Sequence, residues 1–323
     1  MNTSAMQVAL LDHSFKITRD LDAPVDMVYR AWAEPEQFKR WWGPHSYENR
    51  LTVYDAQPGG KLRVVMCGPD GGEYPMNGEF KELVPGQKIV MILDLVEHPV
   101  EWHRFYNQTR GLPEDSPLPM IKTTITLEDL GGKRTRMHVE QWYELAADRD
   151  AFIELGTTDG WGQSFTKLDN LLATLQTERE MIVSRVMDAP KALIWKAWSS
   201  AEHVARWWGP NGFRNTFTEF DLRTGGRWVY TMHGPDGTDY PNWMEFEEVV
   251  PMDRILYVHG SFENDPNSFR GHTTFEEVEG NKTRVTFHLT VQSGAVRDQL
   301  MSFGAFEGGD QNLARLVAYL QEV

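Results

Sequence analysis

The sequence predicts an α+β fold in two copies, each a curved antiparallel sheet around a long C-terminal helix, with two short helices near its N-terminus. The chain repeats itself, and both repeats have the same order of patterns: a strand, two helices, several strands and a helical stretch. Its 323 residues suffice for two domains of about 150 residues each. We therefore predict copy one at residues 1–177 and copy two at 178–323.

The repeat is clearest in the segment Trp41–Pro44, Trp-Trp-Gly-Pro, which recurs 166 residues later as Trp207–Pro210. Beyond Pro85 the offset falls to 148 residues. Copy one therefore has 18 extra residues, the difference between 166 and 148, and they lie within 97–120. This stretch is rich in proline and charge, and we predict that it forms an inserted loop between two strands.

Each copy begins with an extended stretch followed by Ala-Pro, and proline suits the first turn of a helix. A pair of helices follows and ends at Gly-Pro, which cannot continue a helix. The predicted extended stretches are 14–22 and 181–188, and the predicted helices are 24–33, 35–42, 190–198 and 201–208.

The middle of each copy alternates apolar and polar residues, as strands with one buried face do. Leu62, Val64 and Met66 share a face, and the offset places Trp228, Tyr230 and Met232 on the equivalent face. Gly-Pro-Asp-Gly sequences at 68–71 and 234–237 predict hairpin turns.

Each copy ends in a helical stretch with apolar residues at core-facing spacing, such as Leu168 and Leu172 in copy one. In copy two, Trp161 is replaced by glycine, which gives Gly308-Gly309 inside the helix. Glycine in a helix interior costs about 1 kcal/mol relative to alanine. We therefore expect a kink, or a wider cavity mouth, in copy two.

Composition excludes several classes of function. The net charge of −15 repels phosphate, so nucleic acid is not an expected partner. No apolar run approaches the roughly 20 residues of a membrane span, and the first residues do not form a secretory signal. A single cysteine, Cys67, allows no intrachain disulfide. We expect a cytoplasmic protein.

Candidate chemistry is sparse. Glu97, His98, Glu101 and His103 lie within seven residues but match no standard metal site, and we interpret them as solvated charges. His259 is the best single acid–base candidate, although a lone histidine on an apolar face is more often a hydrogen-bonded core residue. We therefore predict no catalytic residue, no metal and no cofactor. The paired tryptophans are interpreted mainly as packing.

The inward faces of the predicted sheets and terminal helices supply candidates for lining a ligand cavity. Methionine thioethers suit irregular apolar ligands, and a few polar groups would orient them. The candidates are Met66, Met91, Gln141, Tyr143 and Trp161 in copy one, and Tyr230, Met232, Tyr257, His259 and Phe287 in copy two.

Ala-Pro before the first helix, Trp-Trp-Gly-Pro after the second, Gly-Gly before a strand and Gly-Trp before Leu168 form a set. This set resembles the family of homologues of the activator of heat-shock protein 90 ATPase, within the START-like (Bet v 1-like, SRPBCC) superfamily. The resemblance covers nearly the whole chain, twice. It implies a helix-grip fold, often with an apolar cavity between sheet and helix, and it implies little about function.

Three functions remain open. The leading hypothesis is a non-enzymatic protein that binds a small hydrophobic or amphipathic ligand in one or both cavities. A co-chaperone-like interaction module and a cyclase- or hydrolase-like enzyme are the alternatives. Because the connection between the copies at 176–179 is short, we expect the two domains to pack on each other.

Overall fold

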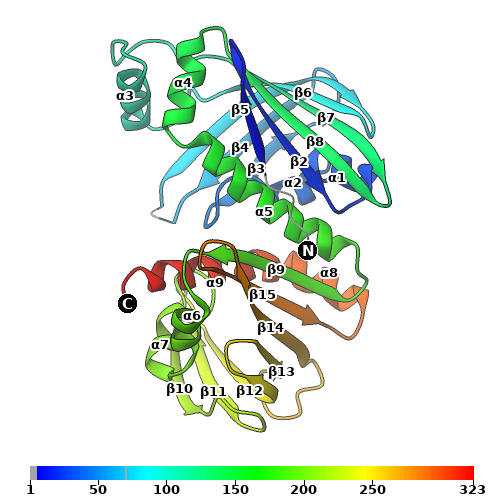
Figure 1. The fold of residues 1–323 in the computed structure, drawn as a ribbon, viewed down its shortest axis with the longest axis vertical. Coiled ribbons are helices and arrows are strands. Elements are labelled where there is room, and N and C mark those ends of the chain that lie inside the picture. The colour runs from blue at the N-terminus through cyan, green and yellow to red at the C-terminus, as the bar shows by residue number, and fades with distance from the viewer. Residues whose placement is uncertain (1–5, 70) are drawn as a thin grey trace. The chain divides into compact units, whose positions relative to one another are not determined.

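The computed structural model describes residues 6–69 and 71–323. The chain divides into two compact units, residues 1–172 and 173–323, which contain copy one and copy two. Each unit is an antiparallel sheet with a long helix along one face, as Figure 1 shows for α5 in the first unit and α9 in the second. The predicted fold class is confirmed.

The first sheet has eight strands within the described residues, in the order β1-β2-β8-β7-β6-β5-β4-β3. Its strands are β1 (Gln7–Leu10), β2 (Ser14–Leu21), β3 (Glu48–Tyr54), β4 (Lys61–Cys67), β5 (Glu73–Val84), β6 (Lys88–Asp94), β7 (Ile121–Gly131) and β8 (Arg134–Trp142). The helices are α1 (Val25–Ala33), α2 (Pro35–Trp41), α3 (Val100–Thr109), α4 (Ala146–Glu154) and α5 (Thr157–Leu175).

The second sheet has seven strands in the described part of the chain, in the order β10-β11-β12-β13-β14-β15-β9. Its strands are β9 (Glu180–Met187), β10 (Arg214–Phe220), β11 (Arg227–His233), β12 (Asp239–Val250), β13 (Arg254–Gly260), β14 (Phe269–Val278) and β15 (Lys282–Thr290). The helices are α6 (Lys191–Trp198), α7 (Ala201–Trp207), α8 (Gly294–Ser302) and α9 (Ala305–Leu320).

The core of each unit lies between the sheet and its long helix. On β2 the residues Phe15, Ile17 and Leu21 are fully buried and alternate with partly exposed neighbours, as a strand with one buried face requires. Leu168 and Leu171 of α5 are also fully buried. The apolar residues that alternate along the strand and those at helical spacing on α5 therefore pack in one apolar layer.

The terminal helical stretches differ from the prediction because each contains two helices. Gly156 separates α4 from α5, and Gly304 separates α8 from α9. Both glycines have a positive φ, 84° and 83°, which other residues rarely adopt. α9 is not interrupted at Gly308-Gly309, where a kink or a wider cavity mouth is predicted, and a Cβ on Gly309 would lie 3.1 Å from Val183.

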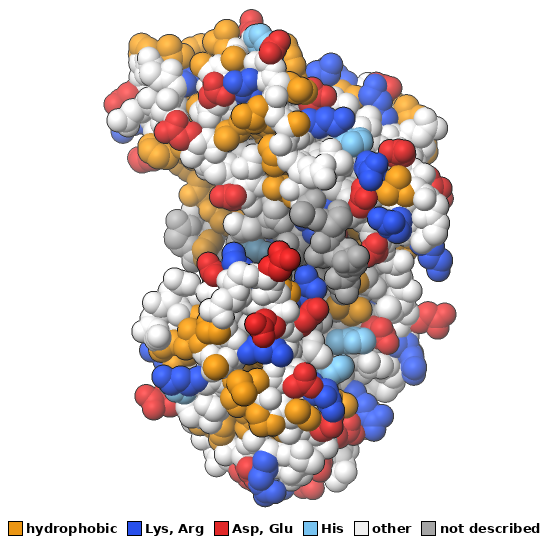
Figure 2. All heavy atoms as spheres, viewed as in Figure 1, with side chains coloured by type: hydrophobic (Ala, Val, Ile, Leu, Met, Phe, Trp, Pro, Cys, Tyr) orange, Lys and Arg blue, Asp and Glu red, His pale blue; other side chains and the backbone are white. Residues whose placement is uncertain are grey.

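The insertion also differs from the predicted loop, because it contains α3. The helix begins directly after Pro99, and Trp102 stacks on Tyr106 one turn later, at 5.3 Å. Val100 and Phe105 of α3 are each 58% exposed, and Figure 2 shows orange apolar side chains in the region where Figure 1 places α3 and α4. The insertion thus has one apolar face inward and another outward.

Smaller differences concern β1, which the pattern did not indicate, and element ends shifted by a residue or two. The predicted turn at 234–237 connects β11 to β12. The equivalent turn at 68–71 includes Asp70, which lies outside the described residues. No helix in the described ranges is long and apolar enough to cross a membrane.

Candidate functional site

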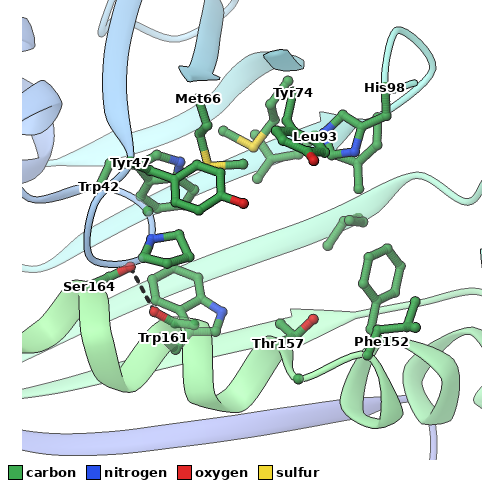
Figure 3. A pocket seen from close by; sticks show the side chains of 18 of the residues that line it. Trp42, Tyr47, Met66, Tyr74, Leu93, His98, Phe152, Thr157, Trp161 and Ser164 are labelled. Atoms are coloured by element: carbon green, nitrogen blue, oxygen red, sulfur yellow. Dashed lines mark hydrogen bonds between the residues drawn. The ribbon is translucent and has the colours of Figure 1, made fainter. Parts of the chain in front are cut away.

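A cavity of about 390 Å³ lies in copy one between the sheet, the insertion and the junction of α4 with α5. Most of its lining is aromatic, aliphatic or thioether, including Trp42, Met66, Met76, Leu93 and Trp161. Figure 3 shows Met66, Leu93 and Tyr74 on the sheet side and Trp161 and Thr157 on α5 opposite them. Such a pocket has the size and polarity of a site for a small organic molecule.

The two tryptophans of Trp-Trp-Gly-Pro have different surroundings. The indole nitrogen of Trp41 donates a hydrogen bond of 2.9 Å to the carbonyl of Ala31, so Trp41 connects α2 to α1 inside the core. Trp42 lines the cavity and contacts Trp161 edge to face at 5.2 Å. The interpretation of these residues as packing therefore describes Trp41, whereas Trp42 also belongs to the cavity wall.

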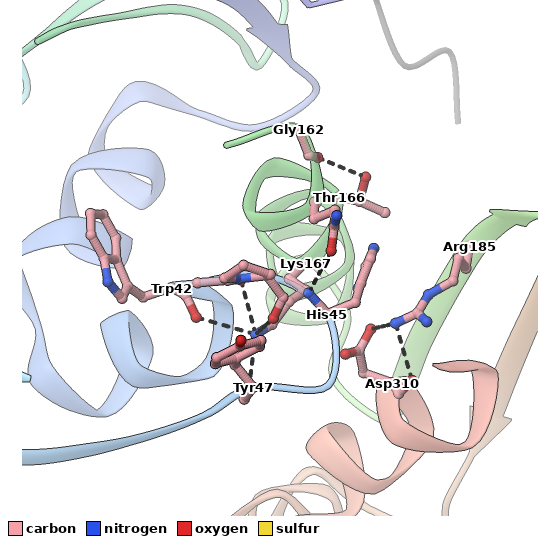
Figure 4. Close-up of polar contacts among 11 residues, drawn as sticks. Trp42, His45, Tyr47, Gly162, Thr166, Lys167, Arg185 and Asp310 are labelled. Carbon is pink, nitrogen blue, oxygen red and sulfur yellow. Dashed lines mark hydrogen bonds and ion pairs between the residues drawn. The ribbon is translucent and has the colours of Figure 1, made fainter. Parts of the chain in front are cut away.

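The loop that carries Trp42 is fixed to α5 by polar contacts, which Figure 4 shows. The Lys167 ammonium group is buried and donates to the carbonyl oxygens of residues 42, 43, 44 and 47, at 3.2 to 3.5 Å. The Gln163 side-chain oxygen accepts from the backbone N–H of His45 at 3.0 Å. These carbonyls follow the C-terminus of α2, where a positive charge is favourable.

Copy two fixes the same loop with aligned residues. Arg315 stands where copy one has Lys167, and its guanidinium donates to the carbonyls of Trp208, Gly209 and Pro210 at 2.7 to 3.2 Å. The Gln311 oxygen accepts from the Asn211 N–H at 3.0 Å. The motif thus consists of the Trp-Trp-Gly-Pro loop together with a glutamine and a cation on the long helix.

Gln141 of β8 is a buried polar group in the cavity wall. Its amide nitrogen donates to the Thr123 hydroxyl at 3.2 Å, and its oxygen accepts from the Trp161 indole at 3.2 Å. Gln141 is only 6% exposed. These contacts fix the orientation of the amide, so it presents a defined polar point in a mainly apolar wall.

The insertion supplies a further wall through His98 and Trp102, whose rings meet edge to face at 4.7 Å. His98 is 8% exposed, and burial lowers its pKa from 6.5 to about 4, so the imidazole is neutral near pH 7. Glu97 pairs with Arg63 at 2.8 Å, and His103 contacts the carbonyl of Leu95. The prediction that these residues are solvated charges is therefore wrong for His98, which faces the cavity.

Buried polar contacts hold the insertion in place. The Arg110 guanidinium donates to the Asp148 carboxylate of α4 at 2.5 Å, and the Tyr106 hydroxyl donates to the same carboxylate at 3.0 Å. Asn107 donates to the carbonyls of Glu114 and Ser116. The wall formed by α3 is thus anchored to α4 through Asp148.

Of the five cavity candidates in copy one, Met66, Gln141 and Trp161 line the cavity. Met91 is buried in the sheet beside Phe80, its partner in the β5–β6 register, and Tyr143 packs on Phe152 at 5.1 Å. Neither is among the lining residues. Sequence reasoning missed His98 and Trp102, for which the available signal was Pro99 followed by aromatics four residues apart, a pattern typical of a helix start.

Of the candidates in copy two, Tyr230 and His259 contact each other and share polar contacts with their neighbours. The Trp208 indole donates to the Tyr230 hydroxyl at 2.8 Å, and that hydroxyl lies 3.3 Å from His259 Nε2. The His259 ring also contacts the Asn242 side-chain oxygen at 2.9 Å. Phe287 packs against Trp208 at 5.9 Å. Tyr257 lies across Gly271, where a Cβ would be 2.0 Å from its ring, and Met232 lies similarly against Gly209.

At four inward positions of the sheet copy two has a ring where copy one does not, whereas on the long helix Trp161 of copy one corresponds to Gly309. At the offset of 166, Leu62, Val64, Met91 and Leu93 of copy one correspond to Trp228, Tyr230, Tyr257 and His259. Trp228, Tyr230 and Tyr257 are at most 3% exposed. Rings therefore occupy positions in copy two where copy one has smaller aliphatic groups or a thioether.

His259 makes copy two sensitive to acid. Burial lowers the pKa of His259 from 6.5 to about 4. At a pH between 4 and 6.5 the unfolded chain binds a proton at this histidine that the folded chain does not bind. The free energy of unfolding is therefore unaffected by His259 above pH 6.5, and it decreases as the pH falls below 6.5. From these two pKa values we expect the histidine to cost about 2 kcal/mol of stability at pH 5.

The variant His259→Leu, which introduces the residue of copy one, should remove this loss. We expect the variant to lose about 2 kcal/mol less than the wild type between pH 7 and pH 5. Hydrogen–deuterium exchange on peptides of β13 and β12 measures the difference for copy two alone. Equal losses in the two proteins would contradict the prediction.

A model of the family described as activator of Hsp90 ATPase homolog 1-like protein matches residues 22–173 and, a second time, residues 188–321. No curated protein sequence matches the chain. Among solved structures, a protein from Arthrobacter aurescens is 24% identical over 52% of this chain and 91% of its own, with a TM-score of 0.44.

A protein from Mycobacterium smegmatis is 22% identical over 53% of this chain and 96% of its own, with a TM-score of 0.43. The di-domain ARO/CYC BexL from the BE-7585A biosynthetic pathway is 14% identical over 95% of this chain and 98% of its own, with a TM-score of 0.40. The two family matches together span most of the sequence. The chain belongs to the family of activator of Hsp90 ATPase homolog 1-like proteins and contains two copies of its domain.

Proposed function

We propose that copy one binds a small, uncharged and mainly apolar ligand in its cavity, and that copy two, which has no insertion and carries rings at Trp228, Tyr230 and Tyr257, does not. The observation that carries the proposal is the cavity itself, about 390 Å³ and lined by Trp42, Trp161, Met66 and the insertion. A mainly apolar pocket of this size, partly lined by an insertion that copy two does not have, supports a ligand site specific to copy one.

The chemistry of the lining supports binding more than catalysis. Among the described residues that line the cavity, His98 is the one histidine, and there is no carboxylate, amine or thiol. General acid–base or nucleophilic catalysis requires a second group that activates or orients the first. Gln141, Thr157 and Ser164 instead provide neutral polar points that would orient a ligand. The co-chaperone-like role stays a prediction.

The experiment uses 2-ethylnaphthalene as an uncharged apolar probe and the full chain. We expect one equivalent to bind per chain with a micromolar Kd, to quench tryptophan fluorescence, and to raise the midpoint of thermal unfolding by mass action. Native mass spectrometry of the purified protein tests in addition for a copurified small molecule.

The control variant is Leu93→Trp, which places a larger ring at the cavity wall where copy two has His259. We expect it to remain folded and to bind the probe at least about tenfold more weakly, because the ring occupies ligand space. Absence of quenching and of stabilisation in the wild type would refute the proposed function. Two equivalents per chain would refute the assignment to copy one alone.

A further inference from the structure

Two phenol hydroxyls face the cavity of copy one. Tyr47, from the loop before β3, and Tyr74, on β5, both line it. Their rings pack together with centroids 5.9 Å apart and planes inclined by 53°. In Figure 3 the hydroxyl oxygens of both residues point toward the open centre, and the Thr157 hydroxyl faces the same space from α5.

Comparison with copy two separates the role of the Tyr47 hydroxyl from the packing of its ring. The equivalents of Tyr47 and Tyr74 are Phe213 and Tyr240. The Phe213 and Tyr240 rings are 5.8 Å apart and inclined by 48°, almost the same geometry. Packing at this point therefore requires a ring and not the Tyr47 hydroxyl, which copy one has in addition and which lies at its cavity.

The surroundings define what these hydroxyls can bind. A phenol is a good hydrogen-bond donor, and a carbonyl oxygen has two lone pairs that two donors can share. The described lining residues include no charged side chain that could pair with an ionic ligand, and burying an unpaired charge is strongly unfavourable. Met66, Leu93 and Trp161 supply apolar surface on both sides of the hydroxyls.

We propose that the ligand of copy one is a flat, uncharged, mainly apolar molecule with a ketone or comparable carbonyl oxygen, which accepts hydrogen bonds from the hydroxyls of Tyr47 and Tyr74. The proposal rests on the proposed function, because it specifies the ligand of the same cavity. It makes Tyr47 and Tyr74 the residues that determine specificity, with the apolar wall supplying most of the contact area.

The test compares 2-acetylnaphthalene with 2-ethylnaphthalene, which has nearly the same shape and lacks the carbonyl. In the wild type we expect the ketone to bind about tenfold more tightly, the ratio that one good hydrogen bond supplies. In Tyr47→Phe and Tyr74→Phe the ratio should fall toward one, while the Kd of 2-ethylnaphthalene changes less than about twofold. The matched control is Tyr240→Phe, the same change in copy two, which should leave the ratio intact.

The carbonyl stretch of 2-acetylnaphthalene labelled with ¹³C at the ketone carbon gives a second readout. Its infrared band should shift to lower frequency in the wild type and return toward its position in hydrocarbon solvent in Tyr47→Phe. Equal affinities of the two probes in the wild type, or an unchanged preference in both variants, would overturn this inference and leave the proposed function intact. Failure of both probes to bind would instead refute the proposed function.

Discussion

Replacing Lys167 with methionine is expected to lower the free energy of unfolding of copy one by about 2 to 3 kcal/mol. The Lys167 ammonium group is the common hydrogen-bond donor to four carbonyl oxygens of the loop at 42–47. Methionine has a similar length and no donor, so these carbonyls would lose a charged partner in a buried place. Because Trp42 and Tyr47 belong to this loop, the cavity should become less ordered.

The matched control is Lys167→Arg, since copy two uses Arg315 at the aligned position and contacts the equivalent carbonyls. We expect this variant to stay within about 1 kcal/mol of the wild type, because charge and donors are retained. Hydrogen–deuterium exchange on peptides of copy one measures both variants without interference from copy two. Equal protection in Lys167→Met and the wild type would show that the loop does not depend on the ammonium group.

The sequence predicted the fold of each copy in most of its detail because the same patterns occur twice. Apolar and polar residues alternate around Leu62 and Val64, and they alternate in the same way around Trp228 and Tyr230 of copy two. This agreement identifies the face of the strand that points into the core. The break at Gly156 was not predicted, since a glycine near apolar helical residues is compatible with either a continuous or an interrupted helix. Its positive φ is a property of the backbone that the sequence alone does not specify.

The cavity was predictable only in part. Met66, Gln141 and Trp161 lie on periodic elements, so their direction follows from the pattern. His98 and Trp102 belong to an insertion without an equivalent in copy two, and comparison of the copies could not orient them. Lys167 was missed although a cation occupies the aligned position in both copies, because a charged residue on a helix is usually solvent-exposed. Its burial depends on carbonyls from a segment about 120 residues earlier.

Replacing Asp148 with alanine is expected to detach the insertion from the wall of the cavity. The side chains of Arg110 and Asp148 are 4% and 3% exposed, so loss of the carboxylate leaves a buried guanidinium without its counterion. Breaking such a pair typically costs about 3 to 5 kcal/mol. In Asp148→Ala the loss of stability cannot exceed the free energy needed to open the insertion, because α3 can move outward until Arg110 is hydrated.

Detachment would remove Trp102 and His98 from the cavity, so the affinity for 2-ethylnaphthalene should fall at least about tenfold, in proportion to the lost apolar contact. The control is Asp150→Ala on the same helix, whose carboxylate is 60% exposed and pairs with Arg149 at the surface. Exposed pairs contribute at most about 1 kcal/mol, so this variant should bind the probe normally. Faster amide exchange in residues 100–109 of Asp148→Ala, without change in copy two, would locate the effect in the insertion. If the probe instead binds Asp148→Ala and the wild type equally, the insertion does not form a binding wall, and the ligand contacts must come from the sheet and α5 alone.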